Sequence, residues 1–272
     1  MARRGFFLLL VTVLLAGTET GCRTAPITGR KQLLLVPEAQ EIEMGLSAFS
    51  DAIGDDPVSS NVQYQQLIQR VGSRIAAVAN RPDYQWEFKV IASPEQNAFC
   101  LPGGKVAVYE GIIPICQNEA GLAVVMSHEV AHALARHGGE RMSQGYVVNG
   151  ASQALSFVLR KQEETRRQQI MSAYGVASKY GFLLPYSRKH ESEADHMGLI
   201  MMAQAGYDPA EAPRFWERFA ASHAGSEKPP EFLSTHPADE RRADDLRRLL
   251  PDAEIAYQNS ANKFGLGESI VR

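Results

Sequence analysis

The sequence predicts an α+β fold that is mainly helical, with one small β-sheet early in the chain. Strand-like runs are confined to "YQWEFKVIAS" (84–93) and "KVAVYEG" (105–111). Apolar residues recur at helical spacing before and after them. With 272 residues, 44% of them hydrophobic, the chain can bury one sizeable core. A net charge of −3 gives no basic field, so we expect no nucleic-acid partner.

The first residues are expected to lie outside the fold. Arg3 and Arg4 precede the apolar run "GFFLLLVTVLLAG", the pattern of a secretory signal. The run is shorter than the ~20 apolar residues that span a bilayer. We therefore expect a signal peptide at 1–21 and a single domain at 22–272.

Helical periodicity and the position of Pro and Gly set the remaining elements. Pro37 lies near the start of the first helix, and Gly206 ends a later one. The Pro-Gly-Gly in "NAFCLPGG" (97–104) predicts a turn between the two strands. We expect helices in these ranges: 37–54, 61–80, 118–137 (stopped by Gly138-Gly139), two within 140–185, 187–207, 209–222 and 236–250.

The segment "NEAGLAVVMSHEVAHALARH" (118–137) carries the most informative spacing. His128 and His132 are four residues apart, so a helix places them on one face, where both imidazoles can ligate one metal ion. Glu129 is rotated by about 100° and can serve as a general base without being a ligand. Burying these groups beside so many apolar residues would be costly without a partner such as a metal ion.

A zinc hydrolase needs a third protein ligand and an open position. His137 lies five residues beyond His132, so it is expected to point off the shared face and to solvate the helix end. In "HESEADHMG", Glu191 and Asp195 are four apart and share a helix face, whereas Glu193 points elsewhere and is interpreted as a surface residue. A merely charged helix face is the alternative for this stretch.

Three motifs in order carry a family resemblance: "HEVAH" (128–132), "SRKHESEAD" (187–195) and "LSTHP" (233–237). The chain resembles the zinc metallopeptidases that include the CAAX prenyl protease, the bacterial heat-shock protease HtpX and exported bacterial lipoproteases. The stretches "GCRTAPITGRKQLLLVPEAQE" and "NAFCLPGGKVAVYEGII" resemble the lipoprotein branch. The resemblance implies a zincin-like domain of the gluzincin type, with a small mixed sheet beside the HExxH helix.

The resemblance also implies roles for individual residues. His128, His132 and Glu191 would bind one Zn²⁺ per chain, and Glu129 would be the catalytic base. Asp195 would orient a ligating histidine from behind. With three ligands the metal is one short of a closed structural site, which favours a catalytic one.

Two further residues keep alternatives open. His236 would stabilise the oxyanion or occupy the open metal position; otherwise it caps a helix before Pro237. Arg242 would anchor Glu191 or the oxyanion; otherwise it is charge on a solvated helix. Three other histidines are interpreted as surface residues: His190, His196 and His223.

Cys22 in "TETGCRTAP" resembles the site where bacterial lipoproteins are cleaved and acylated, although Glu19 stands where an aliphatic residue is usual. A lipid anchor there would hold the chain on the periplasmic face of the outer membrane; a soluble exported protein is the alternative. Export would permit a Cys100–Cys116 disulfide, but two small buried thiols are the commoner outcome. Cys100 is expected to be a wall of the site.

The expected function is that of an exported zinc endopeptidase that hydrolyses unfolded or misassembled envelope proteins. The alternating pattern of "KVAVYEG" predicts a half-buried strand, which the resemblance places at the edge of the cleft, where an extended substrate would add to the sheet. The alternative is a chaperone-like binding protein with little proteolysis. The intact HExxH argues against pure binding, because binding needs no general base. Oligomeric state is not predicted.

Overall fold

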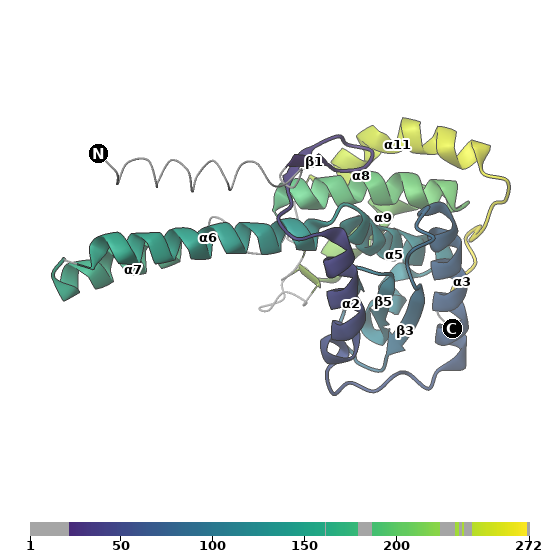
Figure 1. Cartoon of the computed structure of the whole chain (residues 1–272). Coiled ribbons are helices and arrows are strands. Elements are labelled where there is room, and N and C mark those ends of the chain that lie inside the picture. Colours follow the sequence, from purple (N-terminus) through teal and green to yellow (C-terminus); the bar gives the residue numbers. More distant parts are fainter. Residues whose placement is uncertain are drawn as a thin grey trace.

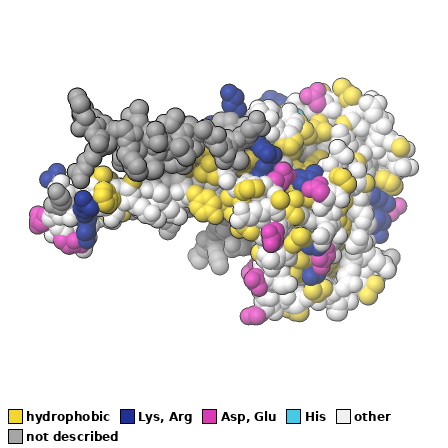
Figure 2. All heavy atoms as spheres, in the orientation of Figure 1, with side chains coloured by type: hydrophobic (Ala, Val, Ile, Leu, Met, Phe, Trp, Pro, Cys, Tyr) yellow, Lys and Arg dark blue, Asp and Glu magenta, His cyan; other side chains and the backbone are white. Residues whose placement is uncertain are grey.

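The computed structural model describes residues 22–160, 162–178, 187–223, 232–233, 236 and 241–270 (Figure 1). The predicted signal peptide, residues 1–21, lies outside the described residues. The predicted class is confirmed, since long helices surround a small sheet. Charged side chains of both signs are interspersed over the face shown in Figure 2.

The elements follow one another as listed here: β1 Cys22–Thr24, β2 Lys31–Leu33, α2 Glu38–Ile53, α3 Val62–Val78, β3 Glu87–Ile91, β4 Ala98–Leu101, β5 Lys105–Tyr109, η1 Glu110–Ile112, α4 Ile113–Cys116, α5 Glu119–Leu134, α6 His137–Leu159, α7 Glu164–Ser178, α8 Arg188–Gln204, α9 Glu211–Ser222 and α11 Arg242–Asn259. The helices at 38–53, 62–78, 188–204 and 211–222 lie within three residues of the predicted ends. The last helix starts later and runs further than predicted, through Pro251.

The larger sheet is mixed, with strand order β3-β5-β4. β3 pairs with β5 in parallel, and β4 pairs with β5 antiparallel. β4 was not predicted as a strand, because only four residues separate the polar stretch before it from the Pro-Gly-Gly turn. The central position of β5 also corrects an expectation: β5 is paired on both sides, so it cannot accept a substrate strand. Among the described residues β4 is an edge strand with no partner on its other side, and it packs against α5.

β5 is also buried on both faces, not half-buried. Val106 and Val108 pack into the main core with α3 and α5. Ala107 and Tyr109 form a second cluster with Phe49 of α2. Helices therefore cover both faces of this strand, which explains why apolar residues occupy successive positions.

α5 is buried over nearly its whole circumference. Every residue from Ala120 to Ala133 is buried, and the Asn118 side chain caps the helix by accepting a hydrogen bond from Gly121 N (2.8 Å). The helix ends at Leu134, three residues earlier than predicted. Arg136 takes a left-handed conformation (φ 55°), held by two hydrogen bonds to Glu41 (3.0 and 2.7 Å). The chain then begins α6 in a new direction, and Gly138-Gly139 lies inside that helix.

α8 approaches α5 closely at a glycine. A Cβ on Gly198 would lie 3.0 Å from the backbone nitrogen of His128 and 3.1 Å from its Cα. Gly198 therefore allows the helix that carries Glu191 to pack against the helix that carries the paired histidines.

Gly198→Ala is expected to destabilise the fold by about 1–3 kcal/mol, because the added methyl overpacks rigid backbone. Gly150→Ala on α6 is the matched control, since a Cβ there meets nothing within 4 Å. It should stabilise the protein by up to ~1 kcal/mol through helix propensity. Urea unfolding of both variants measures the difference; equal stabilisation by the two substitutions would contradict the close packing.

α6 and α7 lie side by side and project away from the body (Figure 1). Four large apolar side chains on α6 are exposed: Tyr146, Val147, Phe157 and Val158. In the part of the chain that the structure describes, no helix is long and apolar enough to cross a bilayer.

Candidate metal centre

Three predicted ligands meet between α5 and α8. The Nε2 atoms of His128 and His132 lie 3.0 Å apart. Glu191 faces both, with Oε2 3.4 Å from His128 Nε2 and Oε1 3.4 Å from His132 Nε2. All three side chains are at most 4% exposed. Helical spacing thus aims both imidazoles at the same point, opposite a carboxylate from a separate helix.

His236 joins the same cluster. Its Nδ1 lies 3.1 Å from Glu191 Oε1 and 3.4 Å from His128 Nε2, and the side chain is 3% exposed. One ligand atom from each of His128, His132, Glu191 and His236 lies within 4.8 Å of the others. His236 therefore lies where a fourth donor would lie, which agrees with the alternative that it occupies the open metal position.

The chemistry of these residues fits a divalent metal ion. Imidazole nitrogen and carboxylate oxygen are the donors of such sites in hydrolases. Oε1 of Glu129 is buried and accepts no hydrogen bond from the described residues, and the buried Oε2 of Glu191 faces the Arg242 guanidinium (3.2 Å) and His128 Nε2 (3.4 Å). Burial lowers the pKa of His132 well below its usual value, which keeps the imidazole in the neutral form that ligates. A cation would supply a further partner for these buried acceptors.

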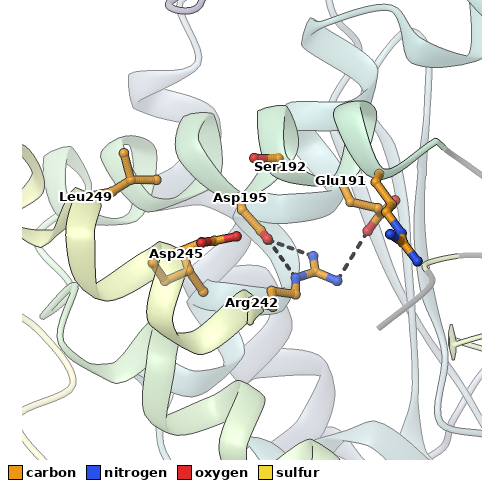
Figure 3. Close-up of a pocket in the computed structure, with 8 residues that line it drawn as sticks. Glu191, Ser192, Asp195, Arg242, Asp245 and Leu249 are labelled. Atoms are coloured by element: carbon orange, nitrogen blue, oxygen red, sulfur yellow. Dashed lines mark hydrogen bonds and ion pairs between the residues drawn. The ribbon is translucent and has the colours of Figure 1, made fainter. Parts of the chain in front are cut away.

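Asp195 and Arg242 lie behind His128. Oδ1 of Asp195 is 3.0 Å from His128 Nδ1, and Arg242 donates two hydrogen bonds to this carboxylate (2.7 and 2.6 Å). Arg242 also approaches Glu191 (3.2 Å) and lies over the ring of Trp216. Figure 3 shows Arg242 between the two carboxylates, beside a pocket where α8 and α11 meet. Arg242 is 5% exposed, so the alternative of a solvated helix charge is wrong.

Glu129 is 3% exposed and lies at the edge of the cluster, with Oε1 3.5 Å from His236 Nε2. Burial raises its pKa to about 7, against the opposing charge of His236. Cys100 on β4 lies near enough that the charge of Glu129 adds to the effect of burial in raising the thiol pKa. Cys100 and Cys116 are both free thiols in the structure, and Cys116 is fully buried.

Several residues that were expected on the surface are buried beside the four-residue cluster. His137 is fully buried, with Nδ1 2.8 Å from His132 Nδ1 and Nε2 2.9 Å from Glu193 Oε2. Glu193 and His190 are each 4% exposed, and His190 bonds to Glu140 (3.0 Å). His196 and His223 are partly buried, and His223 contacts Gln96.

The expectation for His137 was wrong because it assumed one unbroken helix. Arg136 breaks the helix in a left-handed conformation, and this break turns the next side chain back toward His132. Residue spacing carries no signal for such a break at a non-glycine residue. Burial lowers the pKa of His137 to about 4, while its hydrogen bond to Glu193 opposes that shift.

Comparison of the sequence with known proteins identifies a family. The model of "Peptidase family M48" matches residues 63–250, which include both site helices. "Mitochondrial metalloendopeptidase OMA1" of Schizosaccharomyces pombe is 37% identical over 238 residues, covering 86% of this chain and 68% of that protein. The human protein named "Metalloendopeptidase OMA1, mitochondrial" is 29% identical over 248 residues (86% and 47%). "Beta-barrel assembly-enhancing protease" of Escherichia coli is 27% identical over 249 residues (90% and 51%).

The chain spans about half to two thirds of the length of these relatives. The matched region contains the paired histidines, Glu129 and Glu191, in the arrangement described above. The family match covers more than half of the chain, and the first relative named exceeds 30% identity. The chain therefore belongs to peptidase family M48 and is a metallopeptidase.

Proposed function

We propose that the chain is a zinc-dependent endopeptidase that hydrolyses unfolded or misassembled proteins of a cell envelope. The observation that carries the proposal is a buried cluster of two helical histidines and a carboxylate from another helix, with a buried glutamate beside it. Neutral imidazoles and one carboxylate are the donors of catalytic zinc sites such as the His₂Glu class. The relatives are named as proteases, which agrees with this chemistry.

In the proposed mechanism His128, His132 and Glu191 hold the metal. When bound, zinc acts as a Lewis acid that polarises the scissile carbonyl and acidifies water. Glu129 accepts the proton of the attacking water and later delivers it to the leaving nitrogen. Its buried position suits this exchange, because burial brings its pKa close to neutrality.

His236 has two proposed roles. Its Nε2 faces Glu129, so a protonated ring nitrogen there can donate to the oxyanion that forms on the carbonyl. Its Nδ1 faces the other ligands, so the same residue can close the donor set. A closed set would slow hydrolysis, and this observation favours the second candidate function, a chaperone-like binder with little proteolysis.

β4 is the proposed binding edge for substrate. In its antiparallel pairing with β5, the main chain of Phe99 and Leu101 faces β5. The N–H and C=O groups of Cys100 therefore point away from β5, on a strand that packs against α5. An extended peptide that adds there would be held by main-chain hydrogen bonds, which read little sequence. Such a site suits unfolded segments of many sequences.

Unfolded substrates provide the test. The purified mature chain should cleave reduced, alkylated lactalbumin and casein, and should leave native lysozyme intact. Product masses from mass spectrometry would report cleavage at internal peptide bonds. Cleavage of neither unfolded protein, together with suppression of aggregation by wild type and Glu129→Gln alike, would favour the binding function instead.

We also propose that Cys22 is acylated and anchors the chain at the periplasmic face of the outer membrane. Cys22 is the first residue of β1, so an anchor there would adjoin the fold directly. Two of the relatives have names that place them in mitochondria, whereas we propose that this chain lies in a bacterial envelope.

Cys22→Ser is expected to release the chain from membranes when the full chain is expressed in a Gram-negative host. A lipid anchor binds through its buried methylenes, at about 0.8 kcal/mol each, and the serine variant has none. Fractionation of membranes, with mass spectrometry of the N-terminus, measures the change. Wild type that is soluble and carries no lipid would contradict the anchor.

A further inference from the structure

Each of the two histidines of α5 makes a contact through its Nδ1 atom, on the side of the ring away from the other proposed ligands, but the two partners differ. Nδ1 of His128 meets Asp195 directly, and Arg242 fixes that carboxylate. Nδ1 of His132 instead meets another histidine, His137, at 2.8 Å. Ligating histidines usually donate their second ring N–H to a fixed acceptor, which sets both the tautomer and the ring orientation. His137 occupies the place of that acceptor.

The contacts continue from His137 to the N-terminal hairpin, residues 22–33, which consists of β1, β2 and their connection. His137 Nε2 lies 2.9 Å from Glu193 Oε2. Arg30 of the hairpin donates to Glu193 (2.8 Å) and makes two hydrogen bonds to Glu140 (3.1 and 2.7 Å). The Thr28 hydroxyl also bonds to Glu193. Thus Arg30 holds the carboxylate that receives His137.

The protons along this row have one consistent arrangement. Because His132 directs Nε2 toward the other ligands, its Nδ1 carries the proton and donates to His137 Nδ1. His137 then carries its own proton on Nε2 and donates it to Glu193. Glu193 accepts from Arg30 as well, so each donor along the row meets an acceptor.

We propose that His137 is a positioning residue for the metal centre, which orients the ring of His132. Arg30 of the N-terminal hairpin fixes the orientation of His137 by holding the Glu193 carboxylate. The inference rests on the proposed function, since it requires His132 to ligate a metal. It makes hairpin docking part of the assembly of the site: a displaced hairpin leaves Glu193 without Arg30, and His132 loses its fixed orientation. The segment next to the proposed anchor at Cys22 is thereby coupled to metal affinity.

Replacement of His137 tests the first step. His137→Phe keeps a planar ring of similar bulk but can neither accept from His132 nor donate to Glu193. We expect it to weaken Zn²⁺ binding about 10–100-fold, measured by competition with a chromophoric chelator. It should also alter the visible absorption of the Co²⁺-loaded protein, which reports ligand geometry. His137→Gln should restore affinity to within a few fold, because one amide can accept from His132 and donate to Glu193.

His190→Phe is the matched control. His190 is also buried, stacks on His137 with ring centroids 4.4 Å apart, and bonds to Glu140. Its substitution disturbs the same polar cluster, including the Glu140 carboxylate that Arg30 also binds, but replaces none of the groups that form the hydrogen bonds from His132 through His137 and Glu193 to Arg30. A purely structural role predicts that His190→Phe and His137→Phe lower the unfolding midpoint together and leave Zn²⁺ affinity alone.

Replacement of Arg30 tests whether the N-terminal hairpin acts on His137 through Glu193. This substitution changes none of the four residues of the proposed ligand cluster. Arg30→Met should weaken Zn²⁺ binding and change the Co²⁺ spectrum in the same direction as His137→Phe. Arg23→Met, in the same hairpin but 59% exposed and 3.9 Å from its partner Glu38, should do neither. If His137→Phe does not fold, the Arg30 and His137→Gln variants still decide the question.

Folded His137→Phe and Arg30→Met proteins with wild-type Zn²⁺ affinity and wild-type Co²⁺ spectra would overturn the proposal. That outcome leaves the proposed function standing, since the wild type would still bind metal. Wild type that binds neither Zn²⁺ nor Co²⁺ would overturn the proposed function and the positioning role together.

Discussion

Glu129→Gln is expected to lower kcat/KM for peptide hydrolysis by about 10²–10⁴-fold, the usual contribution of a general base. The amide keeps the shape of the side chain but cannot accept the proton of water. Glu129 lies outside the four-residue ligand cluster, so zinc content should be unchanged. Hydrolysis of a quenched fluorescent peptide and metal analysis of the same sample measure the two quantities.

The control for Glu129 is Glu110→Gln, since the Glu110 carboxylate follows β5, accepts a hydrogen bond from the Ser59 hydroxyl and is not part of the four-residue cluster. It should retain activity. Glu129→Gln protein that is free of contaminating protease and hydrolyses peptide at the wild-type rate would remove Glu129 from the mechanism.

Glu191→Ala is expected to abolish both tight zinc binding and activity. The substitution removes a proposed metal ligand and also leaves the nearby Arg242 guanidinium with one carboxylate fewer in a buried site. Loss of one partner of a buried ion pair costs about 3–5 kcal/mol, so the metal-free fold should also be less stable. The pKa of the Glu191 carboxyl lies below the usual carboxyl range, because hydrogen bonds from His128 and His236 outweigh the effect of burial. The Glu191 carboxyl is therefore ionised at neutral pH.

Lys189→Ala on the same helix, with an exposed side chain, is the control for Glu191. Zinc stoichiometry and thermal unfolding, with and without added zinc, should separate the two variants. The unfolding temperature of Glu191→Ala should not respond to zinc, whereas that of Lys189→Ala should rise as in wild type. Equal zinc content in Glu191→Ala and wild type would contradict the assignment.

The parts of the site that depend on helical spacing could be predicted from the sequence. His128 and His132 share a face because four residues make about one turn, and the apolar residues around them require a buried helix. Glu191 and Asp195 follow the same rule on α8, and the family motifs assign them to the same centre. Local strand propensity also predicts a small sheet, and the family resemblance places it beside the HExxH helix.

The rest depends on contacts that spacing does not encode. Arg136, at the turn that brings His137 behind His132, bonds to Glu41, which lies 95 positions earlier in the chain. Glu193 looked like a surface charge, yet it pairs with Arg30, 163 positions away. The central place of β5 follows from β4, whose four residues carry too little pattern to predict a strand. Pairings between residues so far apart in the sequence can be identified only from the tertiary structure.

The most direct measurement of the central claim is a zinc titration of the chelator-treated protein, followed by peptide hydrolysis at each step. Activity should be absent without metal, rise in proportion to added zinc, and saturate at one zinc per chain. Full activity in protein shown to contain no metal would contradict a metallopeptidase mechanism at His128, His132 and Glu191.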